Sequence, residues 1–246
     1  MGEIKVQGAQ VLFTIFGVEI TQTILSMTVV TLLLGIAGIL LGRNLTKRPG
    51  KMQVLTEKGV GMLYNLVVDV MGKHNASWVP YISTIFLSSI FGSLIGLTGF
   101  LRSTTADLSV VLTWSVMTSV IIWYQNIKRN GLLGWLKGFT EPIVVMTPMN
   151  IVSEIAQPFA MAFRHFGNIA SGTVIMGLLR WALGNLSYMI FSKLPGVLGQ
   201  VFGQIPLLQV GIPAVFSIYF DIFSSLLQAF IFCMLTMMYI GSAAEE

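Results

Sequence analysis

The chain has 246 residues, of which 54% are hydrophobic and 10% are charged, and its formal net charge is +4. Soluble domains are about a quarter charged, so this composition excludes an ordinary soluble domain and indicates a protein embedded in lipid. The basic residues follow apolar runs, as membrane topology requires. No nucleic-acid partner is therefore expected from the positive charge.

Four uncharged stretches are each long enough to cross a bilayer as a helix. They cover residues 20–42, 75–101, 108–127 and 194–220. A spanning helix needs about 20 apolar residues, whereas a membrane barrel shows alternating hydrophobicity over about ten residues, a pattern this sequence lacks. We therefore predict an all-α integral membrane protein that forms a single domain over residues 1–246.

In chain order, the first crossing helix is expected over residues 20–42. Residues 52–72 then place apolar and charged side chains at helical spacing, which predicts an amphipathic helix lying on the cytoplasmic membrane surface. Two further crossing helices are expected over residues 80–101, where Pro80 opens the helix, and 108–127.

Asp107 directly precedes the helix expected over residues 108–127. An aspartate at this place is a favourable N-cap, because its carboxylate accepts a backbone N–H of the first turn. Together with Arg102 it could instead order the outer loop or line an access path, and the sequence leaves these alternatives open.

The last hundred residues differ from the rest. Residues 147–191 are apolar but contain Glu154, Arg164 and Arg180. One helix of this length would measure about 65 Å, twice the hydrocarbon thickness, so it must tilt strongly or break. After a loop over residues 192–206, the return helix over 207–241 is also overlong. We predict that these last two of about five crossing helices are long, tilted and form a hairpin.

The distribution of basic residues sets the orientation of the chain. Lysines and arginines are concentrated in segments 43–74 and 128–141, which follow the first and third crossings. The positive-inside rule places both segments in the cytoplasm. The N-terminus is then expected outside and the C-terminus inside, in the plasma or inner membrane of a cell.

The long helix over 147–191 carries a polar stripe centred on Arg164. At about 100° per residue, five polar side chains lie within about 40° of this arginine, and Glu154 lies at the edge of the stripe. The five are Asn150, Ser153, Gln157, Asn168 and Ser171. The return helix has a matching polar face. It contains Asp221, Ser225, Gln228 and Tyr239.

A guanidinium inside a membrane helix costs several kcal/mol. The stripe therefore predicts that this face of the helix meets water or a charged partner, as in a transport protein. A structural ion pair between Arg164 and Asp221, or an Arg164 that extends to the lipid headgroups, are the alternatives.

Four ordered motifs support a more specific reading. The segment around the arginine reads Pro158-Phe-Ala-Met-Ala-Phe-Arg164-His-Phe-Gly-Asn168-Ile-Ala-Ser-Gly172. The others are Thr105-Ala-Asp-Leu108, Asn150-Ile-Val-Ser-Glu154, and Leu227-Gln228-Ala-Phe-Ile-Phe followed by Leu235-Thr236 and Tyr239-Ile240. Together they resemble subunit a of F-type rotary ATP synthases of the bacterial type, most strongly over residues 80–246.

The resemblance implies an ion-translocating stator beside a ring of c-type subunits, with a peripheral-stalk subunit of the b type as a further partner. Arg164 would face the carboxylate of a ring subunit, help it to release its ion, and prevent direct leakage between two offset half-channels. The expected half-channel lining is Asn168, Ser171, Asp221, Gln228, Tyr239 and Glu154. The translocated ion would be H+, with Na+ as the alternative.

The sequence departs from the family pattern at two places. Related sequences often have a Glu/His pair at the positions of Thr173 and Asp221, so Asp221 is here the sole ionisable member. His165 replaces a residue that is commonly leucine in the family. It lies about 100° from Arg164, so it either faces the interior of the subunit or serves as a proton relay.

Two other function classes compete with the stator. A self-contained ion-coupled carrier would often show an internal repeat and paired broken helices, and no repeat is found. An intramembrane enzyme needs a nucleophile–base or metal constellation, which two separated histidines and one cysteine do not provide. No phosphate-binding glycine loop is present either, so we expect a non-catalytic chain that binds no ATP, no cofactor and no metal.

Overall fold

The computed structural model describes residues 11–15, 17–43, 45–191 and 207–245. Within these residues, five helices are long and apolar enough to cross a membrane: Gln22–Gly42, Lys73–Thr98, Leu108–Gly138, Val144–Ile190 and Gly211–Ala243. The predicted all-α membrane fold is therefore confirmed. The loop expected over residues 192–206 lies outside the described residues.

The helices and strands follow one another in a simple order. They are β1 (Val11–Ile15), β2 (Val18–Thr21), α1 (Gln22–Gly42), α2 (Lys51–Met71), η1 (Lys73–Trp78), α3 (Val79–Leu94), η2 (Ile95–Thr98), η3 (Thr104–Ala106), α4 (Leu108–Gly138), η4 (Val144–Met146), α5 (Thr147–Phe191), α7 (Leu207–Ser217), η5 (Ile218–Phe223) and α8 (Ser224–Glu245).

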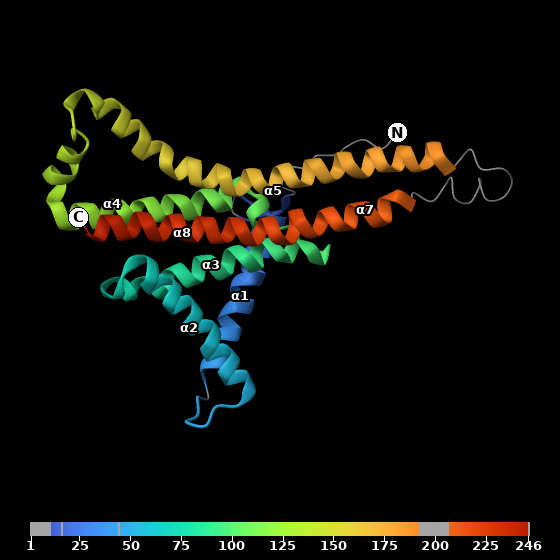
Figure 1. The fold of residues 1–246 in the computed structure, drawn as a ribbon, viewed down its shortest axis with the longest axis horizontal. Helices are drawn as coiled ribbons and strands as arrows, with labels where there is room; N and C mark the ends of the chain where they lie inside the picture. Colours follow the sequence, from blue (N-terminus) through green and yellow to red (C-terminus); the bar gives the residue numbers. More distant parts are fainter. Residues whose placement is uncertain (1–10, 16, 44, 192–206, 246) are drawn as a thin grey trace.

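Four layers of helix run alongside one another and make the body of the molecule. In Figure 1, α3, α4, α5 and the continuous α7–α8 helix extend along the long axis, whereas α1 and α2 project from one side. The last two helices form the predicted hairpin, with α5 packed against α4, α7 and α8. If α1 follows the bilayer normal, the hairpin is strongly tilted in the membrane, as its length requires.

Lipid is the solvent implied by the distribution of side chains. Along α1, large apolar side chains such as Leu33 and Ile39 are exposed by 60% and 69%. The buried positions of the same helix include Thr23 and Ser26. Hydroxyl residues inside and leucines outside are the arrangement expected where helices associate within a bilayer.

The apolar core lies where the hairpin meets the earlier helices. Residues of α2, α3, α4 and α8 form one cluster around Met71, Ile82 and Met237. Residues of α3, α4, α5 and α8 form a second cluster around Trp114, Met161 and Phe232. The amphipathic helix expected over residues 52–72 is α2, which buries Val67 and Met71 against this core.

Two predicted helices have different ends in the structure. The helix expected over 80–101 ends at Leu94 and continues as the short η2 turn. The helix expected over 108–127 extends to Gly138, with a kink at Gly131, whose φ is 69°. Glycine adopts this left-handed conformation without steric cost, so the chain bends and continues as a helix.

Candidate functional site

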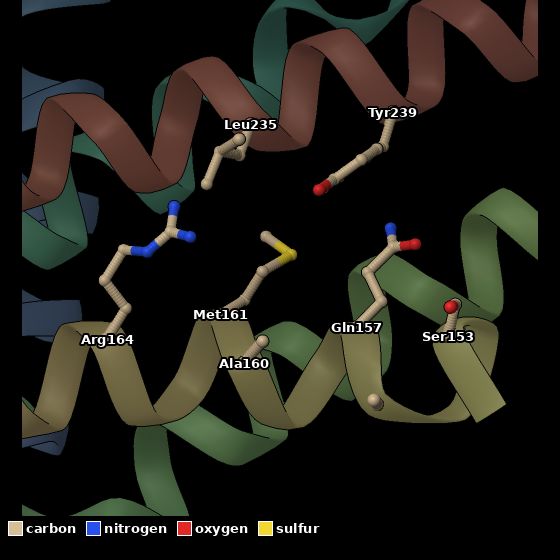
Figure 2. Close-up of a pocket in the computed structure, with 8 residues that line it drawn as sticks. Ser153, Gln157, Ala160, Met161, Arg164, Leu235 and Tyr239 are labelled. Atoms are coloured by element: carbon tan, nitrogen blue, oxygen red, sulfur yellow. The ribbon is translucent and has the colours of Figure 1, made fainter. Parts of the chain in front are cut away.

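Arg164 lies on α5 with its side chain exposed. Among the described residues, no side chain or backbone group forms a hydrogen bond or an ion pair with it. Figure 2 shows its guanidinium pointing from α5 toward α8, close to Leu235. A permanently protonated guanidinium in an apolar helix needs water or an acid beside it. This chain supplies no acid within reach of Arg164 in the part that the structure describes.

A pocket of about 370 Å³ extends from Arg164 along the groove between α5 and α8. Its lining is Ser153, Ala156, Gln157, Ala160, Met161 and Arg164 from α5, with Leu235 and Tyr239 from α8. Arg164 stands at one end and Ser153 at the other, and Gln157 and Tyr239 reach toward each other from the two helices (Figure 2). A polar hollow of this size has room for several water molecules.

The spacing of the lining residues explains why the pocket is continuous. Ser153, Gln157 and Arg164 recur at intervals of four and seven residues, so they share one face of α5. The small side chains of Ala156 and Ala160 leave the space between them open. Three residues of the predicted stripe are therefore brought together with Tyr239 of the return helix.

The remaining stripe residues lie elsewhere along the helix. Asn168 accepts a hydrogen bond of 2.8 Å from the hydroxyl of Ser224 on α8, and the exposed Ser171 donates to the backbone carbonyl of Asn168. Asn150 donates to the backbone carbonyls of Phe139 and Glu141, before α5 begins.

Gln228 is a buried residue of α8, and its amide nitrogen has no hydrogen-bond partner among the described residues. The bond between Asn168 and Ser224 sets the antiparallel register of α5 and α8. One turn further along each helix, this register places Gln228 opposite Arg164. The predicted lining residues Gln228 and Arg164 therefore stand at the same level of the hairpin.

Asp221 lies half-buried within η5, a π-helical turn between α7 and α8. Such single π turns inside longer helices occur often at functional sites. Asp221 forms no ion pair with Arg164 in the described structure, which argues against the internal structural pair that the sequence left open. The nearest cation that acts on its carboxylate is Arg180 of α5.

Glu154 does not line the pocket, although it neighbours Ser153. Its carboxylate accepts a hydrogen bond of 2.5 Å from the indole nitrogen of Trp123 on α4. The two residues lie beside a separate apolar hollow between α4 and α5. Its predicted role as half-channel lining stays a prediction, because its side chain is turned toward α4.

His165 faces the interior of the subunit, as one of the two alternatives expected. It is fully buried, its Nε2 lies 3.2 Å from the hydroxyl of Ser89 on α3, and its ring packs edge-on against Phe232 of α8 at 5.5 Å. Its other nitrogen, Nδ1, has no partner among the residues that the structure describes. His165 thus links three helices behind Arg164.

Asp107 has the capping role that the sequence offered. Its carboxylate accepts the backbone N–H of Ser109 in the first turn of α4. The other carboxylate oxygen accepts a hydrogen bond from the hydroxyl of Thr23 on α1. The aspartate therefore joins α1 to the start of α4 as well as capping the helix.

Comparison with known proteins agrees with the motifs and the fold. The protein-family model described as "ATP synthase A chain" matches residues 23–241. This chain belongs to the ATP synthase A chain family. It is 30% identical to "ATP synthase subunit a, sodium ion specific" of Propionigenium modestum, an alignment covering 94% of this chain and 77% of that protein.

Two further bacterial relatives are named ATP synthase subunit a. The protein of Bacillus velezensis is 32% identical, covering 92% of this chain and 93% of the relative. That of Bacillus subtilis is 32% identical, covering 89% of each. As a member of this family, the chain is a subunit of the membrane sector of an F-type ATP synthase, and the resemblance seen in its motifs is confirmed.

Several features of this family member could not be read from its sequence. The π turn at Asp221 depends on how α7 and α8 pack, and no local motif marks it. The approach of Gln157 to Tyr239 depends on the register of the hairpin. The carboxylate at Asp221 and the cation at Arg180 are far apart in sequence, so only the fold shows that they act on each other.

Proposed function

We propose that this chain is the ion-translocating stator subunit of the ATP synthase membrane sector. It would offer two offset half-channels to the membrane carboxylates of a rotating c-ring, with Arg164 between them. The observation that supports this best is the exposed guanidinium of Arg164, which has no acidic partner among the described residues of its own chain. A partner acid on a neighbouring subunit would complete the site.

The chemistry of Arg164 fits this task. Its permanent charge favours the ionised form of a carboxylate that comes to face it, so the ring subunit gives up its ion there. The same charge repels a free cation, so ions do not pass directly from one half-channel to the other. They have to travel with the ring, and its rotation drives ATP chemistry on other subunits, while this chain remains non-catalytic.

The pocket beside Arg164 is our candidate for the inner half-channel. It occupies the part of α5 that follows the basic segment 128–141, which the positive-inside rule assigns to the cytoplasm. Ser153, Gln157 and Tyr239 would provide its polar lining. This orientation also places the N-terminus outside and the C-terminus in the cytoplasm.

The outer half-channel would lie on the other side of Arg164. Asn168, Ser171 and Asp221 occupy the hairpin beyond Arg164, and Gln228 lies at its level. The two sets of polar residues are thus displaced along the hairpin, as offset half-channels require. The ion carried is H+ or Na+, and the c-ring together with a b-type peripheral stalk would be the partners.

The test is the Arg164→Ala variant of the whole ATP synthase, reconstituted in lipid vesicles. We expect gradient-driven ATP synthesis to fall to background while the complex still assembles. Arg43→Ala, which removes an exposed arginine after α1, is the matched control and should retain wild-type synthesis. Near wild-type synthesis in the Arg164→Ala complex would rule out the proposed role.

A self-contained ion-coupled carrier is the competing function. A carrier would move ions without a ring of partner subunits, whereas the stator requires one. The purified chain alone, placed in vesicles with an imposed ion gradient, should therefore show no flux above that of empty vesicles. Flux by the isolated chain that is abolished by Arg164→Ala would favour the carrier.

A further inference from the structure

A second charged pair lies in the hairpin beyond Arg164. Arg180 is on α5, about 24 Å further along the helix at 1.5 Å per residue, and Asp221 is in the π turn η5 of the facing helix. Neither residue belongs to the pocket beside Arg164. The two side chains carry opposite charges within an otherwise apolar part of the membrane sector.

Three contacts fix how α5 faces the return helix in this region. Ser224 donates its hydroxyl hydrogen to Asn168 at 2.8 Å, Gly172 lies against the ring of Phe220, and Gln209 donates from its side-chain amide to the backbone carbonyl of Arg180 at 2.6 Å. Together they define one antiparallel register from Asn168 to Arg180. Asp221 falls between Phe220 and Ser224, on the element that faces this stretch of α5.

The backbone at Arg180 is firmly held. Gly184, one turn after it, leaves the space that the amide of Gln209 occupies, and a Cβ atom at Gly184 would overlap that amide. The guanidinium itself is exposed. Long side chains of a helix lean toward its N-terminus, so Arg180 leans toward the level of Asp221 and away from the end of α5.

Arg180 and Asp221 act on each other through their charges. Arg180 has a favourable coulombic interaction with the half-buried Asp221 carboxylate. No ion pair within contact distance joins them in the described parts of the chain. The charges therefore compensate each other across a gap, which leaves room for water or a passing ion between them.

We propose that Arg180 and Asp221 form a charge-compensated pair that lines the outer half-channel, in which Asp221 cancels a guanidinium that would otherwise repel the arriving cation. The inference rests on the proposed function and concerns how ions reach the site. It also explains how this chain works with Thr173 and Asp221 where related sequences have a Glu/His pair. The cation of the pair has moved to Arg180, and the acid has moved to position 221.

The proposal predicts an asymmetric response to neutralising the two residues. Asp221→Asn leaves Arg180 uncompensated, so passive ion flux through the membrane sector should fall by about fivefold, as expected for one unit charge in a partly hydrated site. Arg180→Gln removes the repelling charge and should change flux by less than about twofold. The double variant Arg180→Gln/Asp221→Asn should recover to within about twofold of wild type.

Flux is measured in vesicles holding the complete membrane sector with the catalytic sector removed, and assembly is checked by subunit content. Arg180→Lys is the matched control, because it keeps the charge and should behave as wild type. A double variant as slow as Asp221→Asn would overturn the proposal, since Asp221 would then act independently of Arg180. Unchanged flux in Asp221→Asn would overturn it as well.

A charge-swapped variant keeps the test decisive if Asp221→Asn does not assemble. Asp221→Arg alone should block flux, and adding Arg180→Asp should restore at least about half of it. No restoration in an assembled complex would contradict compensation. The Arg164→Ala experiment is independent of this pair, so the stator function and the outer pair succeed or fail separately.

Discussion

Arg164 and His165 are adjacent in sequence, yet Arg164 is exposed on the surface of α5 and His165 is fully buried behind it. The imidazole of His165 contacts Ser89 on α3 and Phe232 on α8. These contacts fix the rotation of α5 about its own axis. Because the rotation is fixed, the guanidinium of Arg164 is directed along the groove toward α8 (Figure 2).

His165→Leu should preserve both assembly and ion-driven ATP synthesis. Leucine fills a similar volume, and the change removes a buried Nδ1 that has no hydrogen-bond partner in the described structure. These effects offset the loss of the hydrogen bond to Ser89, which is worth about 1 kcal/mol. Thermal denaturation of the purified complex should therefore shift little, and synthesis should stay within about twofold of wild type.

His165→Ala is the contrasting variant at the same position. It leaves a cavity among α3, α5 and α8 and should destabilise the complex by about 2 kcal/mol or more. A proton-relay role for His165 predicts a different pattern. In that case the leucine variant would assemble fully and still lose synthesis, and this result would assign His165 to the ion path.

Glu154 is expected to serve packing through its hydrogen bond with Trp123. Glu154→Gln retains an acceptor oxygen for the indole N–H, so passive flux should remain within about twofold of wild type. Glu154→Leu leaves that N–H without an acceptor, at a cost of about 1–3 kcal/mol. It should lower the amount of assembled complex, measured by subunit content in purified membranes.

Trp123→Phe provides the control for this pair, because it removes the donor itself. Combined with Glu154→Leu it should cost less than the sum of the two single changes, since both remove one interaction. If Glu154→Gln assembles normally and flux falls severalfold, the carboxylate takes part in translocation. That outcome would support the half-channel role predicted for Glu154 from the sequence.

The elements that depend on lipid as solvent could be predicted closely. The uncharged run over residues 20–42 predicts α1, because a helix surrounded by lipid shows its apolar character at nearly every position. The length of the segment 147–191 predicts the long hairpin for the same reason. The hairpin of β1 and β2, with a turn at the positive-φ Gly17, was not predicted, although its alternating pattern is a strand signal.

The candidate site was harder to predict, because α5 passes different neighbours along its length. Counting 100° per residue places Asn150, Gln157 and Asn168 on one face of α5. In the structure the start of α5 meets the loop after α4, its middle meets α8, and its end meets α7. The stripe is therefore divided among a loop contact, a pocket and a helix junction, and helical angles alone carry no information about these neighbours.

The close approach of α3 to the η3 turn yields a prediction about assembly. A Cβ atom at Gly92 would overlap Oγ1 of the buried Thr104, so Gly92→Ala forces the two segments apart. Overpacking of a well-packed interior costs about 1–3 kcal/mol. We expect a lower denaturation temperature and less assembled complex in membranes.

Removing the obstructing hydroxyl should restore stability. Thr104→Ala alone should have little effect, because Oγ1 of Thr104 has no hydrogen-bond partner within the described residues. Combined with Gly92→Ala it opens the space that the new methyl group needs, so the double variant should regain most of the lost stability. Equal instability of the single Gly92→Ala and the double variant would show that the glycine is required for its backbone conformation and not for the close contact with Thr104.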